Sequence, residues 1–380
     1  MKLMSKEFCS RKLFLFVTIS KYRLKSFIRT LTSRLNSCLK SLGNKGQGPT
    51  DPIGNNIIEN LAGEVIGADA SVLDLACKYL KNDQNSLVCE HSIRAMSAYN
   101  SEQYVLRVIE KRTNNVSEYE FYRYLCSNPL DRDFRITPTV YSVVEHEDGG
   151  TNQFKFSIVM ENLEKIGLKD FSHLSACKLA EALSCIPSLS VEEMPLLRIS
   201  PNKITSDLVD QFVSLAIWHN QTDSAAQEAE LESMRKNAKC IGKIDLSQVP
   251  LVPCHNDIHL KNLFFYQEKE KESYVFIDWE QFGLNYLGAD VHHFLRRGSA
   301  GMRHAAVKYN FVDFVDKLYD EYRSLLCDAY ELKHSEFDKS AYYYSLFRCM
   351  QRSVERKFAG REGFMLEETI RLYQGLIRVL

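Results

Sequence analysis

Two polar motifs, separated by a short apolar stretch, carry the residue types that phosphoryl transfer requires. The first runs from Cys254 to Asn262 and the second from Val275 to Glu280. Phosphoryl transfer asks a protein mainly to position the reactants and to neutralise phosphate charge. A carboxylate beside the acceptor hydroxyl takes its proton, and we assign this role to Asp257. Oxygen ligands hold Mg²⁺, and we assign Asn262 and Asp278 to it.

The stretch between the motifs explains how these side chains can meet. Residues 263–266 and 274–277 have the composition of short strands, and the polar residues 267–273 have that of a turn. Paired antiparallel strands align their distal ends, so a hairpin would bring Asn262 and Asp278 to the same edge. The sequence therefore predicts a magnesium site whose ligands come from both ends of a hairpin.

Upstream of these motifs, the pattern predicts a small sheet that carries a cation. Residues 87–91, 94–99 and 104–109 are expected as strands, the last two joined by a polar turn. Arg107 stands among apolar neighbours in the third strand and is the cation that this sheet offers to a nucleotide site.

The segment after this sheet predicts a helix and then a buried strand. Phe121, Tyr122 and Leu125 recur at helical spacing, and Ser117 is the expected N-cap. An apolar run begins at residue 156 and ends in a polar segment after residue 160. This run is typical of a strand that is buried on both faces.

Together these motifs resemble the aminoglycoside phosphotransferase and choline kinase family, which are small-molecule kinases with a protein-kinase-like fold. The resemblance covers roughly residues 60–380. It implies an α+β fold of two lobes, with an antiparallel sheet in the N-lobe, a mainly helical C-lobe, and ATP with Mg²⁺ in the cleft between them. It also implies that Asp257 is the catalytic base and that Asn262 and Asp278 are the metal ligands.

The same resemblance assigns supporting roles to other residues. Arg107 stands where many family members carry the phosphate-binding lysine, and arginine can donate to phosphate bidentately. Two alternatives remain open: Arg107 is a snorkelling strand residue, or Lys111, expected just past the strand end, substitutes for it. Glu118 matches the helix glutamate that orients the phosphate-binding cation. His255 and Asp290 match residues that support the catalytic loop rather than react. The hinge that binds adenine through backbone groups corresponds to residues 160–163, which include Glu161, Asn162 and Leu163.

Several features depart from a protein kinase. Residues 90–96, expected as the loop between the first two strands, contain no glycine, so a glycine-rich phosphate clasp is not evident. Trp279 follows Asp278 where a protein kinase has Phe-Gly, and no Ala-Pro-Glu follows. A long activation segment is therefore not expected. Two interpretations of Glu280 stay open: contact with the metal through water or with the substrate, or capping of the next turn.

The composition fits an enzyme with a packed core. The chain has 380 residues, of which 45% are hydrophobic, ample for a two-lobed catalytic domain. Its 11 cysteines are scattered without a Cys-x-x-Cys pair. We expect free thiols in a reducing compartment, rather than a disulfide frame or a zinc site, and hence a cytoplasmic protein.

Residues 1–42 form a basic extension. Residues 1–45 hold eleven Lys or Arg and one acid, so they carry a net charge of +10 while the rest of the chain carries −11. From Leu24 to Leu42 apolar residues recur every three or four positions with basic residues opposite, which favours an amphipathic helix on an anionic membrane surface. A helix docked on the kinase lobe, a partner-binding arm, a targeting leader and disorder remain alternatives.

Chain breakers and helical periodicity predict the remaining organisation. Residues 43–56 are a glycine- and proline-rich linker, residues 57–163 the N-lobe with the hinge at its end, and residues 164–380 the C-lobe with the catalytic and metal-binding loops. Residues 57–82 show an interrupted helical pattern. Further helices are expected at residues 174–183, 206–222, 225–240, 311–330, 340–357 and 366–380.

Three hypotheses for the function follow. The leading one is an ATP- and Mg²⁺-dependent kinase that phosphorylates a hydroxyl of a small molecule or sugar. The second is a catalytically weak kinase-like module that binds a nucleotide or a partner. The third, a protein kinase, is disfavoured by the missing activation segment.

The sequence gives less information about the phosphate acceptor and about binding partners. Residues 292–304 are basic, which is typical either of an anionic acceptor or of a solvated helix face. A choline-like or aminoglycoside acceptor would instead favour acidic and aromatic groups. Residues 1–42 allow peripheral attachment to a membrane. No nucleic-acid partner is expected, because the basic stretch is a single arm without a recognised motif.

Overall fold

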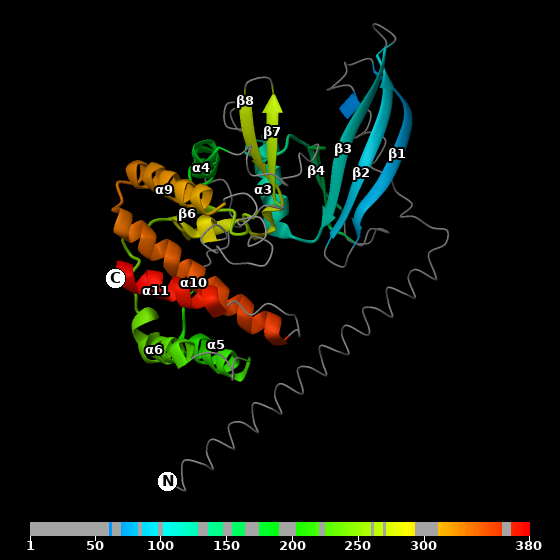
Figure 1. Cartoon of the computed structure of the whole chain (residues 1–380). Helices are drawn as coiled ribbons and strands as arrows, with labels where there is room; N and C mark the ends of the chain where they lie inside the picture. The colour runs from blue at the N-terminus through cyan, green and yellow to red at the C-terminus, as the bar shows by residue number, and fades with distance from the viewer. Residues whose placement is uncertain are drawn as a thin grey trace, which may run out of the picture.

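The computed structural model describes residues 61–62, 70–82, 86–97, 102–127, 136–146, 154–163, 175–189, 203–219, 225–259, 262–268, 271–292, 311–358 and 366–380. They form an N-terminal antiparallel sheet and a mainly helical C-terminal part (Figure 1). The expected two-part α+β architecture is therefore confirmed for these residues. The basic extension at 1–42 and the linker at 43–56 lie outside them.

The N-terminal sheet is antiparallel throughout and has the strand order β1-β2-β3-β5-β4. On β2 every second residue from Leu87 to Ala95 is buried, which is the period of a strand with one covered face. The strands are β1 (Ser71–Asn82), β2 (Ser86–Met96), β3 (Gln103–Thr113), β4 (Val140–Glu145) and β5 (Phe156–Glu161).

The boundaries of β2 and β3 correct the sequence-based expectation. The two strands expected at 87–91 and 94–99 are one strand, because the alternation of buried residues continues between them. Residues 90–96 are therefore not a loop, and residues 83–85, between β1 and β2, lie outside the described part. β3 continues to Thr113, so Lys111 lies inside the strand and not past its end.

The helical pattern expected at 57–82 is wrong for its second half, which is β1. Register shifts between Val72 and Asp74 and between Tyr79 and Lys81 interrupt the pairing of β1 with β2. Each shift inserts a residue and breaks the alternation of a strand, so the apolar residues of β1 recur at uneven spacing that imitates a helix. Only Leu61 and Ala62 are helical in the described part of this region.

Helix α3 (Val116–Ser127) follows β3 and packs against β4 and β5. Its first turn is capped by Asn115, whose Oδ1 accepts the backbone N–H of Glu118 at 3.0 Å. The expected cap, Ser117, lies inside the helix. A side-chain oxygen at the N-cap satisfies one of the backbone donors that a helix start leaves unpaired.

The C-terminal part consists of helices and short hairpins, close to the expected positions. The strand pairs are β6 (Leu251–Cys254) with β9 (Gly283–Tyr286) and β7 (Leu263–Glu268) with β8 (Lys271–Phe276). Two single-turn 3₁₀ helices flank β9, η3 (Trp279–Gln281) and η4 (Ala289–Val291). The helices are α4 (Ala176–Ser184), α5 (Ser206–His219), α6 (Ala225–Ile241), α9 (Phe311–Ala329), α10 (His334–Phe358) and α11 (Leu366–Val379).

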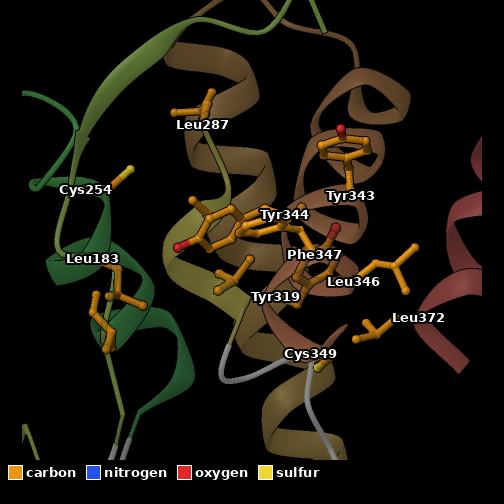
Figure 2. Packing of buried hydrophobic residues seen from close by; sticks show 14 of the residues in the cluster. Leu183, Cys254, Leu287, Tyr319, Tyr343, Tyr344, Leu346, Phe347, Cys349 and Leu372 are labelled. Atoms are coloured by element: carbon orange, nitrogen blue, oxygen red, sulfur yellow. The ribbon is translucent and has the colours of Figure 1, made fainter. Parts of the chain in front are cut away.

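Helix α10 is the centre of the hydrophobic core of this part. It contacts α5, α9, α11, β9 and η4. Figure 2 shows Tyr344 and Phe347 of α10 near Tyr319 of α9, with Leu372 of α11 beyond them. Burying such side chains is the main favourable contribution to folding, about 1.5–3 kcal/mol for a large apolar residue. None of the helices in the described part of the chain combines the length and apolarity that crossing a membrane requires.

We predict that Asn115→Ala lowers the free energy of unfolding by about 1–2 kcal/mol, the usual cost of losing a helix N-cap. The substitution also removes the hydrogen bond that Asn115 Nδ2 donates to the Glu280 carbonyl at 3.2 Å. Chemical denaturation followed by circular dichroism measures the change. The matched variant Ser117→Ala should change the free energy of unfolding by less than about 0.5 kcal/mol. A larger loss in Ser117→Ala than in Asn115→Ala would restore Ser117 as the cap.

Candidate active site

The loop that leaves β6 is held by one buried carboxylate. The backbone N–H groups of His255 and Asn256 donate to Asp290 Oδ2 and Oδ1, at 3.0 Å and 2.7 Å. Asp290 lies in η4, whose start is set by Gly288 in the left-handed conformation at φ 96°. A Cβ at Gly288 would also press on Phe337 of α10. Helix α10, η4 and the loop are therefore positioned as one unit.

Asn256 adopts a left-handed conformation with φ 63°. Asparagine tolerates this conformation better than most residues, but it still costs energy. The side chain offsets that cost, because Nδ2 donates to the carbonyls of Cys254 and Gln281 at 3.2 Å and 3.1 Å. Asn285 Nδ2 in turn donates to Asn256 Oδ1 at 2.6 Å. Asp257, the next residue, is thus presented by a loop whose path is fixed on both sides.

His255 is fully buried, and its ring contacts the neighbouring backbone instead of facing solvent. Its Nε2 lies 3.0 Å from the carbonyl of Ile277, and its ring packs 4.4 Å from the ring of Trp279. Burial lowers the pKa of His255 to about 4, so the imidazole is neutral near pH 7. A neutral ring donates Nε2–H to the Ile277 carbonyl, which ties the loop to the segment that carries Asp278.

The hairpin of β7 and β8 brings Asn262 and Asp278 together, as expected from the sequence. Leu263 pairs with Phe276, and the Ile277 N–H donates to the Asn262 carbonyl at 2.9 Å. Asn262 Nδ2 donates to the Asp257 carbonyl at 3.2 Å. Asp278 is left-handed, with φ 67°, and starts η3. A strained non-glycine residue at the end of a hairpin is typical of a functional site.

The cation at this site is Lys111, which corrects the assignment of Arg107. Lys111 Nζ lies 2.7 Å from Glu118 Oε1 and 2.7 Å from Asp278 Oδ1. Arg107 is exposed on the same strand. Strand alternation places Lys111 and Arg107 on one face, but Lys111 is nearer the end of β3 that faces α3 and η3. Glu118 orients a cation as expected, and the cation is Lys111.

Lys111 is held in its charged form. Burial by itself lowers its pKa, but the carboxylates of Glu118 and Asp278 outweigh that effect and raise the pKa of Lys111 above its ordinary value. Glu118 is completely buried, whereas 37% of the Asp278 side chain is exposed. The Lys111 ammonium therefore pairs with two carboxylates: the buried one of Glu118 and that of Asp278, which solvent or a ligand can reach.

Helix α3 is attached to the Asp278 segment at two further points. The ring of Phe121 stacks on Trp279 with centroids 4.1 Å apart, and Asn115 Nδ2 donates to the Glu280 carbonyl. Burial and the nearby charge of Asp278 raise the pKa of the Glu280 carboxyl above its ordinary value. The position of α3, and with it Glu118, thus depends on the conformation around Asp278.

A residue that sequence reasoning missed lies beside Asp257. Arg352 Nη2 of α10 is 2.9 Å from Asp257 Oδ1, and His259 Nε2 is 3.7 Å from Asp257 Oδ2. The Asp257 side chain is 18% exposed and that of Arg352 is 17% exposed. Arg352 is ninety-five positions from Asp257 in the sequence and sits in an ordinary helical pattern. No local signal marks it.

The three expected hinge residues stand at the end of β5. The Glu161 backbone N–H donates to the Thr139 carbonyl at 2.9 Å. Asn162 Nδ2 donates to Glu90 Oε1 of β2 at 3.2 Å. Leu163 is half-buried. These contacts fix the strand end next to the sheet face that carries Lys111, and adenine binding by its backbone stays a prediction.

Comparisons with known proteins identify the family. Residues 84–356 match the choline/ethanolamine kinase family, which confirms the resemblance expected from the motifs. No curated protein sequence matches the chain.

Several solved structures match the chain at low identity. A spectinomycin phosphotransferase in complex with ADP and spectinomycin is 14% identical over 87% of this chain and 99% of its own, with a TM-score of 0.41. An aminoglycoside phosphotransferase from Alicyclobacillus acidocaldarius is 14% identical over 89% and 95%, with a TM-score of 0.44. A choline kinase from Cryptosporidium parvum is 14% identical over 86% and 95%, with a TM-score of 0.42.

The buried neutral His255 predicts an acid-sensitive fold. Its pKa rises from about 4 in the folded chain to the ordinary 6.5 on unfolding, so the unfolded state binds the extra proton. The stability from this residue is complete above pH 6.5 and is lost as the pH falls toward 4. Between pH 7 and pH 4.5 the free energy of unfolding should fall by about 2–3 kcal/mol more in the wild type than in His255→Gln.

Asp290 changes the stability in the opposite direction. Burial raises the pKa of its carboxyl to about 7 despite the N–H donors of Asn256 and His255, so its contribution to the free energy of unfolding increases as the pH falls. It is present in both proteins, so its contribution cancels in the difference. Urea unfolding at the two pH values measures the effect. Equal losses in the wild type and in His255→Gln would show that His255 is not buried in its neutral form.

Proposed function

Because this chain belongs to the choline/ethanolamine kinase family, and is a phosphotransferase with an alcohol group as acceptor, we propose that it transfers the γ-phosphate of ATP to the hydroxyl of a choline-type amino alcohol. The observation that carries the proposal is the meeting of Lys111, Asn262 and Asp278 at one edge of the β7–β8 hairpin. Asp257 lies on the loop that enters the same hairpin.

The residues present fit a magnesium ion. Asn262 uses its Nδ2 to donate to the Asp257 carbonyl, so its amide oxygen is the atom suited to a cation. Asp278 offers a partly exposed carboxylate. Oxygen ligands of this kind are the ones that Mg²⁺ prefers. When bound, Mg²⁺ would supply positive charge against the nucleotide phosphates.

Lys111, oriented by Glu118, would hold the phosphates of the nucleotide. Asp278 pairs with Lys111 at 2.7 Å. A magnesium ion held by Asp278 would compete for that carboxylate, and the Lys111 ammonium would then have hydrogen bonds to offer to phosphate oxygens. Glu118 remains at 2.7 Å and keeps the ammonium in place. Backbone groups of Glu161, Asn162 and Leu163 are the proposed adenine contacts.

Asp257 is the proposed catalytic base. It accepts the proton of the acceptor hydroxyl as the oxygen attacks phosphorus. Arg352 donates to Asp257 Oδ1 at 2.9 Å, which fixes the direction of the carboxylate and leaves Oδ2 as the oxygen nearer His259. Asp290 and His255 contribute by holding the loop, and Glu280 lies near enough to Asp278 to feel its charge.

A second acceptor class is favoured by one specific observation. The guanidinium of Arg352 lies beside the proposed base, where a small acceptor would bind. A guanidinium recognises carboxylate and phosphate groups bidentately. An acceptor that already carries an anionic group, such as a sugar phosphate, would therefore find a partner there, whereas choline would not. Of the basic stretch at residues 292–304, which first suggested such an acceptor, His292 is described and is buried, and residues 293–304 lie outside the described part of the chain.

The hypothesis of a catalytically weak kinase-like module rests on the arginine at position 107 in place of a phosphate-binding lysine. The ion pair of Lys111 with Glu118 supports Lys111 as that lysine and so weakens this hypothesis. The attachment of residues 1–42 to an anionic membrane remains a proposal that rests on their net charge and apolar stripe. These residues lie outside the described part of the chain.

We predict different outcomes for the two basic residues of β3. Lys111→Met should lower kcat/KM for ATP by about 100-fold or more, because a charge-assisted contact to the phosphates is lost. Arg107→Met should change it less than about three-fold, as expected for an exposed side chain. Steady-state kinetics with varied ATP measures both. A larger effect of Arg107→Met would return the phosphate contact to that residue.

An acceptor screen of amino alcohols, sugars, aminoglycosides and sugar phosphates tests the reaction. We expect turnover with an amino alcohol and a loss of about 100-fold or more in kcat for Asp257→Asn, since general-base catalysis is worth that much. Arg352→Gln should raise KM for a phosphorylated acceptor but not for choline. Arg235→Gln on α6 is the matched control. Equal turnover by wild type and Asp257→Asn would remove Asp257 from the mechanism.

A further inference from the structure

Two cysteines and a histidine meet on the N-terminal sheet, away from the active site. Cys77 of β1 pairs directly with His91 of β2. Cys89 is two residues before His91 on the same strand, so its side chain lies on the same face. The two sulfur atoms and a ring nitrogen of His91 all lie within 4.8 Å of one another.

This group is on the opposite face of the sheet from Lys111. Cys89 pairs with Glu110 of β3, so these side chains share a face. Glu110 is next to Lys111 in the chain, and neighbouring strand residues point to opposite faces. The cluster therefore does not take part in the proposed nucleotide site.

His91 has one ring nitrogen available. The residue is 1% exposed, and its Nε2 lies 2.9 Å from Glu110 Oε2. An ionised carboxylate can only accept, so Nε2 donates to Glu110 and Nδ1 is the nitrogen left for another partner. Within the described part of the chain this buried Nδ1 has no hydrogen-bond partner. A buried polar atom without a partner is unfavourable and points to a missing ligand.

The contacts of Glu110 fit a carboxylate that orients a metal-binding histidine. Arg112 Nε donates to Glu110 Oε1 at 2.7 Å, and Ser157 Oγ donates to the same oxygen at 3.1 Å. Burial tends to raise the pKa of Glu110, but the hydrogen bonds from His91 and Arg112 lower it below its ordinary value. An ionised carboxylate behind a histidine is the usual arrangement that orients a metal-binding imidazole.

We propose that Cys77 Sγ, Cys89 Sγ and His91 Nδ1 bind a zinc ion, with water in the fourth position. Two thiolates and one imidazole form a recognised three-ligand set for Zn²⁺. Sulfur ligands select against Mg²⁺, so this ion is distinct from the one proposed at Asp278. Binding releases the two thiol protons to solvent, while the neutral imidazole gives up no proton.

The thiols are not activated for redox chemistry. Burial raises the pKa of both, that of Cys89 to about 12, whereas reactive redox cysteines have lowered pKa values, because the thiolate is the nucleophile. A metal ion binds the same thiolates and must displace the two thiol protons, so zinc affinity should rise with pH. The spacing of these residues in the sequence does not resemble a zinc motif, since the register of β1 on β2 brings them together.

The test uses the full-length chain, reduced and freed of metal with a chelator. Titration with Co²⁺, a spectroscopic substitute for zinc, should give thiolate-to-cobalt absorption that saturates at about one equivalent. Zn²⁺ should abolish it. Cys77→Ser should weaken binding by about 100-fold or more, since losing a ligand costs more than losing the group behind it. Cys240→Ser, which changes an exposed cysteine of α6, should bind like the wild type.

A second measurement does not depend on the folding of a variant. Cys77 is exposed, so iodoacetamide should modify it in the metal-free wild type, and Zn²⁺ should protect it while leaving Cys240 reactive. Mass spectrometry of the digested protein reads both sites. Absence of the thiolate absorption, unchanged binding by Cys77→Ser, or a Cys77–Cys89 disulfide in place of metal binding would overturn the proposal. Because the readouts are spectroscopic and chemical, the result does not depend on kinase activity.

Discussion

The ion pairs of Lys111 with Glu118 of α3 and with Asp278 link the N-terminal sheet to the C-terminal part. Glu118 is completely enclosed, and a buried carboxylate without a cation would cost several kcal/mol. Lys111 satisfies it and reaches Asp278 of the C-terminal part with the same ammonium group. The sheet, α3 and the β7–β8 hairpin must therefore come together for these charges to be paired. Removing one partner of a buried ion pair destabilises the fold much more than replacing both partners with well-packed apolar residues.

Packing reinforces this electrostatic link. Trp279 lies between Phe121 of α3 and His255 of the loop before β7. A shift of α3 would move Glu118 and, through Trp279, disturb the ring that holds the Ile277 carbonyl. Asp290 then anchors the same loop from the side of α10. Asp257 is thus fixed by a continuous chain of contacts from the N-terminal sheet to the longest C-terminal helix.

Strand β3 illustrates how one short element can serve two purposes. Its alternate residues point to opposite faces, so Lys111 lies at the candidate active site while Glu110 contacts His91 of the cluster with Cys77 and Cys89. Adjacent positions thus face different environments. Arg112 belongs to the same side as Glu110 and pairs with it at 2.7 Å.

The sequence by itself determined the features that depend on residues close together in the chain. The hairpin after Asn262 and the helices from α4 to α11 follow from local periodicity and turn composition, and the pairing of Leu263 with Phe276 bears this out. The tertiary structure alone decided which cation meets Glu118, because the length of β3 depends on pairing with β2 and β5. It also decided that residues 71–82 form β1, where register shifts hide the strand pattern. Arg352 reaches Asp257 across a large sequence separation, and only the packing of α10 against the loop can set such a contact.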